Sequence, residues 1–183
     1  MTLCVNLIHD IAPSEGGGIY RMVVENPRGA EGKYELNKEL GIVELDRILA
    51  APMPFPFEYG FIPGTWSRFD DDPLDIMAIM PIATFPGCLL DVRVIGMFRM
   101  MDTGEEDNKI LAVCKGDETF KQVHDLDEMP SMYLKKIEFF WENYKKLSPK
   151  KSTDGLGWSS RSVAEKYIEE SINYYREKFG TPA

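Results

Sequence analysis

The chain has 183 residues, a length typical of one domain, and its 44% hydrophobic and 28% charged residues are those of a globular protein. Its formal net charge of −9 argues against a nucleic-acid partner, because phosphate backbones are bound by clustered Lys and Arg. We therefore expect a single domain over residues 1–183.

Cysteine and histidine usage narrows the class of protein further. Cys4, Cys88 and Cys114 lie far apart and form no Cys-x-x-Cys pair, so we expect reduced thiols rather than a disulfide framework. With two histidines, a histidine-rich zinc or copper site is disfavoured. The first residues lack the pattern of a signal peptide, and the longest apolar stretch, 76–90, contains two prolines and is too short to span a bilayer. A cytoplasmic protein with no membrane partner is expected.

Strand patterns fill the first two thirds of the chain. Residues 1–18 end in a Glu-Gly-Gly-Gly run and are expected to form an irregular lead-in. From there to about residue 113, short apolar segments are separated by Pro and Gly, as in β-strands. Strands are expected at residues 19–26, 33–37, 41–49, 75–81, 89–99 and 109–114.

Helical periodicity takes over in the last third of the chain. Apolar residues recur at helical spacing over 133–147 and again over 164–179. Ser162 and Glu165 fit a capping box for the second helix, which is expected to end near Gly180. Strands followed by two amphipathic helices favour an α+β fold, a small barrel with helices packed on it.

One strand presents a charged residue on an apolar face. In the 41–49 stretch, Arg47 shares a face with Val43 and Leu45. If that face lines the barrel interior, the guanidinium requires an anionic partner; the alternative is an edge strand. Lys33 and Glu35 are expected on one side of the preceding strand.

Two acidic clusters point to chemistry. Asp70–Asp75 reads DDDPLD, and Asp102–Asp107 reads DTGEED shortly before Lys109. Carboxylates this close repel one another unless a cation lies between them, and Mg²⁺ prefers such oxygen ligands. Pro73 restricts Asp72 to extended conformations, which helps to hold the loop. The alternative is a pair of solvated acidic loops.

Other routes to phosphate or nucleophilic chemistry are not supported. Residues 29–34 have the wrong glycine spacing for a P-loop, and no dinucleotide fingerprint occurs. Residues 70–81 lack the Gly and Glu of an EF-hand. Neither histidine suggests a nucleophilic triad. By elimination, any chemistry is metal-assisted, with carboxylates holding ions and basic residues holding the substrate.

These residues together resemble the family I soluble inorganic pyrophosphatases, in particular the short, prokaryotic-type members. Asp70–Asp75 matches the family signature D-[SGDN]-D-P-[LIVM]-D. Other matches follow the family's order and spacing between about residues 19 and 146: Glu25, Lys33-Tyr34-Glu35, Asp46-Arg47, Glu58-Tyr59-Gly60, Asp102, Asp107, Lys109 and Tyr144-Lys145. The resemblance implies a small five-stranded, mostly antiparallel, OB-like β-barrel flanked by two main α-helices. It also implies Mg²⁺-dependent hydrolysis of pyrophosphate to two phosphates and assembly as a homohexamer.

Roles for individual residues follow from the same resemblance. The implied metal ligands are all carboxylates, with several ions per site: Asp70, Asp75, Asp102, Asp107 and Glu35. The implied phosphate-binding residues are basic or phenolic: Lys33, Arg47, Tyr59, Lys109, Tyr144 and Lys145. Asp72 would accept the proton of the attacking water, and Glu25 would support the metal ligands.

Two positions and two other functions remain open. Tyr144 falls on the apolar face of its expected helix, so core packing competes with a phosphate contact, and one side chain can do both. Phe55 stands where many members carry Tyr, so a hydrogen bond worth about 1 kcal/mol is missing there. A Mg²⁺-dependent nucleotide phosphohydrolase would use carboxylates to bind Mg²⁺ in the same way and is one alternative. A cation-binding scaffold without activity is the other alternative, although every ionisable position of the motif is filled.

Overall fold

The computed structural model describes residues 5–148 and 152–180. The elements in chain order are β1 (Ser14–Gly16), β2 (Ile19–Asn26), β3 (Gly32–Asn37), β4 (Ile42–Ile48), β5 (Glu58–Phe61), β6 (Asp75–Ile79), β7 (Leu89–Asp102), β8 (Glu105–Glu106), β9 (Lys109–Cys114), η1 (Glu118–Phe120), η2 (Leu126–Glu128), α1 (Ser131–Asn143), β10 (Thr153–Ser160) and α2 (Arg161–Phe179). Each of the six expected strands is present, with ends shifted by a few residues.

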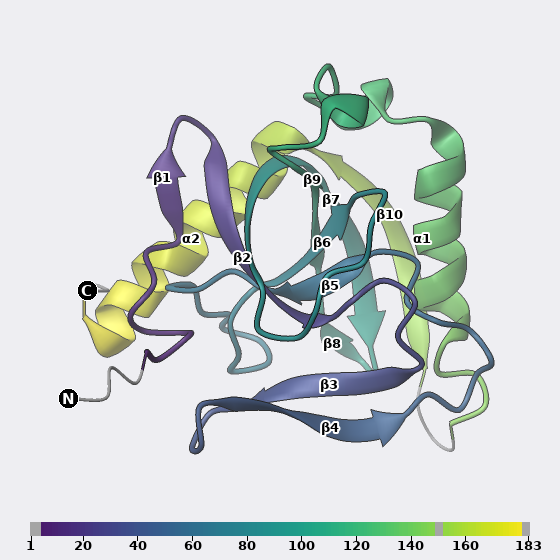
Figure 1. Cartoon of the computed structure of the whole chain (residues 1–183), viewed down its shortest axis with the longest axis horizontal. Helices are drawn as coiled ribbons and strands as arrows, with labels where there is room; N and C mark the ends of the chain where they lie inside the picture. Colours follow the sequence, from purple (N-terminus) through teal and green to yellow (C-terminus); the bar gives the residue numbers. More distant parts are fainter. Residues whose placement is uncertain (1–4, 149–151, 181–183) are drawn as a thin grey trace.

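Five strands close into a ring. β2 pairs with β5, β5 with β6, β6 with β9, β9 with β7, and β7 returns to β2 (Figure 1). The β6–β9 pair is parallel, and the other four pairings of the ring are antiparallel. β10 extends the sheet along β7, on the side that faces α1 in Figure 1. The expected α+β fold, a five-stranded and mostly antiparallel barrel with two main helices, is confirmed.

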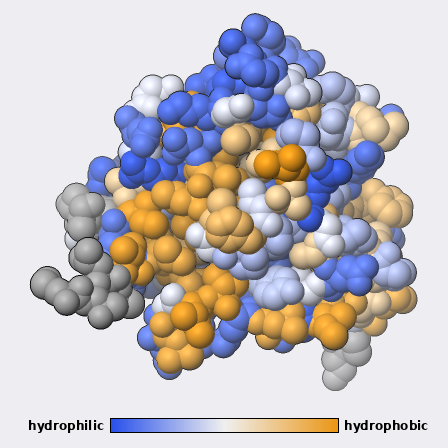
Figure 2. Space-filling view, viewed as in Figure 1, coloured by the Kyte–Doolittle hydropathy of each residue, from blue (hydrophilic) through white to orange (hydrophobic). Residues whose placement is uncertain are grey.

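The strand that carries Arg47 lies outside this ring. β3 and β4 form a separate two-stranded hairpin below the barrel in Figure 1. Leu45 is exposed, and Figure 2 shows apolar surface over this side of the molecule. The expectation that Arg47 faces the barrel interior is therefore wrong, and the edge-strand alternative holds. Because β4 pairs with β3 alone, its alternation does not report a buried face.

The two helices cover different parts of the barrel. Ile137, Phe140 and Trp141 of α1 join one apolar core, while Ala164 and Ile168 of α2 join a second. The residues at the ends of the first expected helical stretch are more exposed: Tyr133, in the first turn of α1, is 38% exposed, and Leu147, which lies beyond the end of α1 at Asn143, is 66% exposed.

The second helix differs from its expected start. It begins at Arg161 after Ser160, without a side-chain capping bond, so the expected capping box is wrong. Glu165 instead pairs with Arg161. The expected end is confirmed, since Gly180 follows the last turn with a φ of 88°.

The N-terminal segment, the cysteines and the expected absence of a membrane span complete the comparison with the sequence. The expected irregular lead-in contains β1, which pairs with β2, and residues 1–4 with Cys4 lie outside the described residues. Cys88 and Cys114 are free thiols. Over the described ranges, no helix is long and apolar enough to cross a membrane.

Candidate active site

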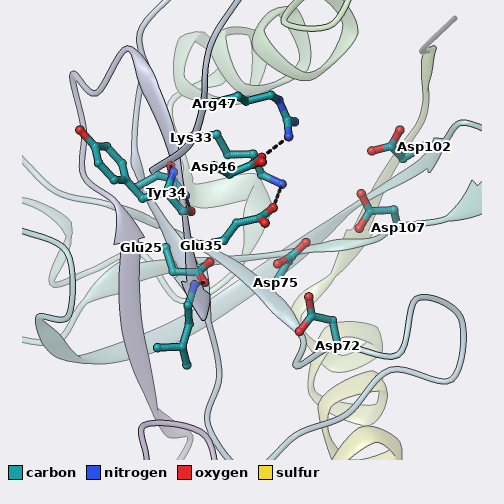
Figure 3. Close-up of polar contacts among 12 residues, drawn as sticks. Glu25, Lys33, Tyr34, Glu35, Asp46, Arg47, Asp72, Asp75, Asp102 and Asp107 are labelled. Carbon is teal, nitrogen blue, oxygen red and sulfur yellow. Dashed lines mark hydrogen bonds and ion pairs between the residues drawn. The ribbon is translucent and has the colours of Figure 1, made fainter. Parts of the chain in front are cut away.

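A cleft of about 490 Å³ gathers most of the polar residues that the sequence singled out. Its acidic lining includes Glu25, Glu35, Asp70, Asp72, Asp75, Asp102 and Asp107, and its basic and aromatic lining includes Lys33, Lys38, Phe55, Tyr59, Lys109, Tyr144 and Lys145. Figure 3 shows carboxylates from the hairpin, the barrel and the 70–75 loop around one common space. Of the expected site residues, Arg47 alone is not among those that line it.

The register of two parallel strands places the central charges. Ile76 of β6 pairs with Ile110 of β9, so the residues that precede them, Asp75 and Lys109, lie side by side where both strands begin. Lys109 ion-pairs with Asp75 and also with Asp107. The sequence puts Asp75 and Lys109 34 positions apart, and the β6–β9 pairing brings them into contact.

Lysines pair with nearly all of the expected metal ligands and with the expected base. The pairs are Lys109 with Asp75 and Asp107, Lys145 with Asp102, Lys33 with Glu35, and Lys38 with Asp72. The Lys33–Glu35 pair confirms that these two side chains share one side of β3. Lys38 was not among the residues expected in the site. Its signal in the sequence was weak, because it is one of several charged residues near a turn.

Burial shifts the protonation of several carboxyl groups in the cleft. It raises the pKa of Glu25 to about 8 and that of Asp72 to about 6. The pKa values of Asp70 and Asp107 are also raised, mainly by burial. Burial acts in the same sense on Asp102, but the Lys145 ammonium outweighs it and holds the pKa of Asp102 below its usual value. Nine carboxyl groups and four lysines are among the described residues that line the cleft, so negative charge exceeds positive charge there even when Glu25 keeps its proton.

This excess of carboxylate is the chemistry that a hard divalent cation satisfies. Within residues 5–148 and 152–180, no three acidic, histidine or cysteine side chains already converge as a cage for an ion. Lysine ammonium groups stand between the carboxylates instead, as Lys109 does between Asp75 and Asp107. Because every ligand in the set is an oxygen atom, the residues fit a hard cation such as Mg²⁺ rather than a soft metal.

Two aromatic residues answer the questions left by the sequence. Tyr144 caps the end of α1, stacks on Phe140 with ring centroids 5.3 Å apart, and also lines the cleft. It therefore both packs in the core and faces the site. Phe55 is 1% exposed and stacks on Tyr59 at 5.7 Å, so it forms part of the cleft wall.

Arg47 lies at the margin of the site. Its guanidinium pairs with the neighbouring Asp46, and Figure 3 places both beside Lys33. Its charge still acts on Tyr144: burial raises the pKa of that phenol, and Arg47 is one of the groups that oppose the rise. Arg47 therefore lies beside the cleft and outside its lining.

Comparison with known proteins identifies the family. The family model described as inorganic pyrophosphatase matches residues 22–176. The chain belongs to the inorganic pyrophosphatase family. The recognition of family I soluble inorganic pyrophosphatases from the sequence is thereby confirmed, as is the expected enzyme class of inorganic diphosphatases.

Individual pyrophosphatases match over most of their length. The chain is 43% identical to the inorganic pyrophosphatase of Geobacillus stearothermophilus over 160 residues, which cover 87% of this chain and 96% of that one. It is 37% identical to that of Haloferax volcanii over 96% of this chain and 99% of the relative. The crystal structure of the Thermus thermophilus inorganic pyrophosphatase superposes with a TM-score of 0.90 at 33% identity, covering 94% and 99% of the two chains.

Proposed function

We propose that the chain hydrolyses inorganic pyrophosphate to two orthophosphates by direct attack of water, with Asp72 as general base and Mg²⁺ as cofactor. One observation carries the proposal: a single cleft combines an excess of carboxylates with a set of lysines directed at them. Such a site can hold cations and a polyanion together, because each offsets the charge of the other.

Carboxylates would hold the ions. Asp70, Asp75 and Asp107, which all line the cleft, would form one group of ligands; Asp102 would join Asp107 for a further ion, and Glu35 would contribute from the hairpin. When bound, Mg²⁺ lowers the pKa of water and neutralises phosphate charge. Glu25 supports this group from β2, where its carboxylate accepts a hydrogen bond from the Leu36 backbone N–H at 2.8 Å.

Asp72 suits the role of proton acceptor. Its side chain is half exposed and lines the cleft, so a water molecule can reach it. Burial raises the pKa of Asp72 to about 6, nearer to neutral pH than that of an ordinary aspartate. A base works best when its pKa lies near the working pH, because it is then both unprotonated and basic.

The basic and phenolic groups would bind the substrate. The implied set is Lys33, Arg47, Tyr59, Lys109, Tyr144 and Lys145. Three of these lysines are paired with carboxylates of the cleft. With cations bound to the carboxylates, the ammonium groups of Lys33, Lys109 and Lys145 would be free to bind phosphate oxygens. A substrate arriving with its ions therefore exchanges one set of ion pairs for another, which keeps the cleft close to charge balance.

The test is phosphate release from pyrophosphate, with Mg²⁺ and with a chelator, beside ATP and a generic phosphomonoester. We expect rapid release from pyrophosphate that requires Mg²⁺, with little from the other two. Preferred release from ATP would favour the nucleotide phosphohydrolase. Mg²⁺ binding by calorimetry without any release would favour the inactive scaffold. Three expectations stay predictions: the single domain over residues 1–183, the homohexamer and the cytoplasmic location. Size measurement in solution tests the homohexamer, and cell fractionation tests the location.

A further inference from the structure

A buried tryptophan stands behind the 70–75 loop. Trp66 is 6% exposed, and the side-chain Nζ atoms of Lys38 and Lys178 each lie 4.9 Å from the centroid of its ring. Ser171 of α2 fixes the backbone of Trp66: its hydroxyl accepts from the Trp66 N–H at 2.9 Å and donates to the Trp66 carbonyl at 2.8 Å. The indole is therefore a fixed platform within cation–π distance of two lysines.

The platform holds the residue between the two functional aspartates. Trp66 Nε1 donates a hydrogen bond to Asp71 Oδ1 at 2.8 Å, and Lys178 ion-pairs with the same carboxylate. Asp71 has a φ of 56°, in the left-handed region, which costs an L-residue conformational free energy. These two contacts offset that cost, and they act on the residue that joins Asp70 to Asp72.

A second lysine reaches the same loop from the other side. Lys38, in the turn between β3 and β4, pairs with Asp72 at 2.7 Å and donates to the Asp71 carbonyl at 3.4 Å. The Ser67 N–H donates to the Asp72 carbonyl at 2.7 Å and closes the loop. Lys38 lines the cleft, but Lys178 is not among the described residues that line it.

We infer that Lys178 and Trp66 are positioning residues for the reaction, which act through Asp71 to fix the direction in which Asp72 enters the cleft. The inference rests on the proposed function, in which Asp72 is the general base. The Lys178–Asp71 pair lies near the surface, with Asp71 76% exposed, so its own contribution to folding is small. Its value is local: a displacement of about 1 Å at a reacting group can cost about 10²-fold in rate.

The first experiment compares Lys178→Met, Lys178→Arg and a control, Lys166→Met, in Mg²⁺-dependent pyrophosphate hydrolysis. Lys166 also lies on α2, but it pairs only with Glu170 at i,i+4. We expect Lys178→Met to lower kcat about 10-fold with KM changed less than about 2-fold, because only the orientation of the base changes. Lys178→Arg should recover most of the rate, and Lys166→Met should match the wild type.

A double-mutant cycle with Asp71→Asn then tests whether Lys178 acts through Asp71. Asn tolerates the left-handed conformation but cannot form the ion pair. In the Asp71→Asn background, Lys178→Met should have no further effect on kcat. Additive losses, or wild-type kcat in Lys178→Met while the wild type is active, would overturn the positioning role alone. A folded wild-type protein without pyrophosphatase activity would overturn the proposed function and this inference with it.

Discussion

Lys109 and Asp75 form an ion pair at the point where two neighbouring parallel strands begin. Lys109 is 2% exposed, and the same ammonium pairs with Asp107. Burial alone would lower the pKa of Lys109, but the two carboxylates outweigh burial and raise it above its ordinary value. A charged lysine therefore stands among the expected metal ligands and balances part of their charge.

Replacing this lysine should make folding dependent on metal. Lys109→Met leaves Asp75 and Asp107 without their cation, and breaking a buried pair costs about 3–5 kcal/mol. We expect urea unfolding in chelator to show a loss of this order, and added Mg²⁺ to stabilise the variant more than the wild type. Pyrophosphate hydrolysis should also fall sharply, since a phosphate-binding group is lost.

The control for this prediction is Lys115→Met. Lys115 is half exposed, and its contacts with Glu15 and Asp91 are 3.7 Å long, so its loss should change stability by less than about 1 kcal/mol. If Lys109→Met in chelator were as stable as Lys115→Met, the charge balance argued for the cleft would be wrong.

A second prediction separates the base from the metal ligands. Asp72→Asn should lower kcat by about 10²–10⁴, the range for loss of a positioned general base, and should leave Mg²⁺ affinity largely intact. Asp75→Asn is the matched variant, because the same change at an expected metal ligand should weaken Mg²⁺ binding instead. Calorimetry and steady-state kinetics on both proteins decide the matter. Near-normal turnover in Asp72→Asn would remove Asp72 from this role.

The sequence predicted the strands that are long or in which apolar and polar residues alternate. It missed strands that are short or mostly polar. β5 has four residues, all buried, so it offers no alternation to detect. β10 reads TDGLGWSS, with two glycines and few apolar residues, and it is identified only by its pairing with β7. Hairpin β3–β4 was recognised as strands but could not be placed, because pairing partners far apart in sequence are not visible in periodicity.

The site was predicted from a motif rather than from geometry. The Asp70–Asp75 signature carried the family, and the cleft brings its residues together with Lys33, Lys109 and Tyr144 as expected. Trp66 and Lys178 could not be found in this way. Their effect on the loop depends on α2 packing against it, which is a tertiary contact between residues more than 100 positions apart.

The missed strand β5 supplies a third prediction. A Cβ added to Gly60 would lie 1.9 Å from the Val23 carbonyl oxygen of β2, a backbone atom that cannot move without breaking the ring. We expect Gly60→Ala to cost about 3 kcal/mol or more in urea unfolding, as overpacking against backbone does. Gly116→Ala is the control, since nothing lies within 4 Å of its added Cβ. Equal stability of the two variants would contradict the close packing of β2 on β5.

Phe55 supplies a fourth prediction. Phe55→Tyr adds a hydroxyl to the cleft wall, at the position where the family resemblance implies Tyr in many members, and should leave the reaction class unchanged. We expect kcat or KM to change by about 5-fold, the equivalent of about 1 kcal/mol for one hydrogen bond. Phe57→Tyr is the control: Phe57 is equally buried but is not among the described residues that line the cleft, so its variant should lose stability with KM unchanged. Abolished turnover in folded Phe55→Tyr would show that the alignment of this segment is wrong.

The last prediction concerns the pH dependence of folding without metal. Glu25 has a pKa of about 8 in the folded protein, raised mainly by burial, against 4.5 as its ordinary value. Between these two pH values the native state retains a proton that the unfolded state has lost. The free energy of unfolding should therefore fall as the pH rises from about 4.5 to about 8, and stabilisation by the protonated carboxyl is complete only below this window.

Glu25→Gln removes this titration and isolates its contribution. The variant should lose the part of the slope due to Glu25, on the order of 3–4 kcal/mol between the two ends of the window. Urea unfolding at a series of pH values in chelator measures the slope, and Glu118→Gln, at an exposed carboxylate of η1, is the control that should follow the wild type. The other carboxyl groups with raised pKa values, Asp72 among them, keep a residual slope in both variants. If Glu25→Gln had the same slope as the wild type, the Glu25 carboxyl would be ionised across the whole window. Burial would then fail to keep Glu25 protonated in the absence of metal, contrary to this prediction.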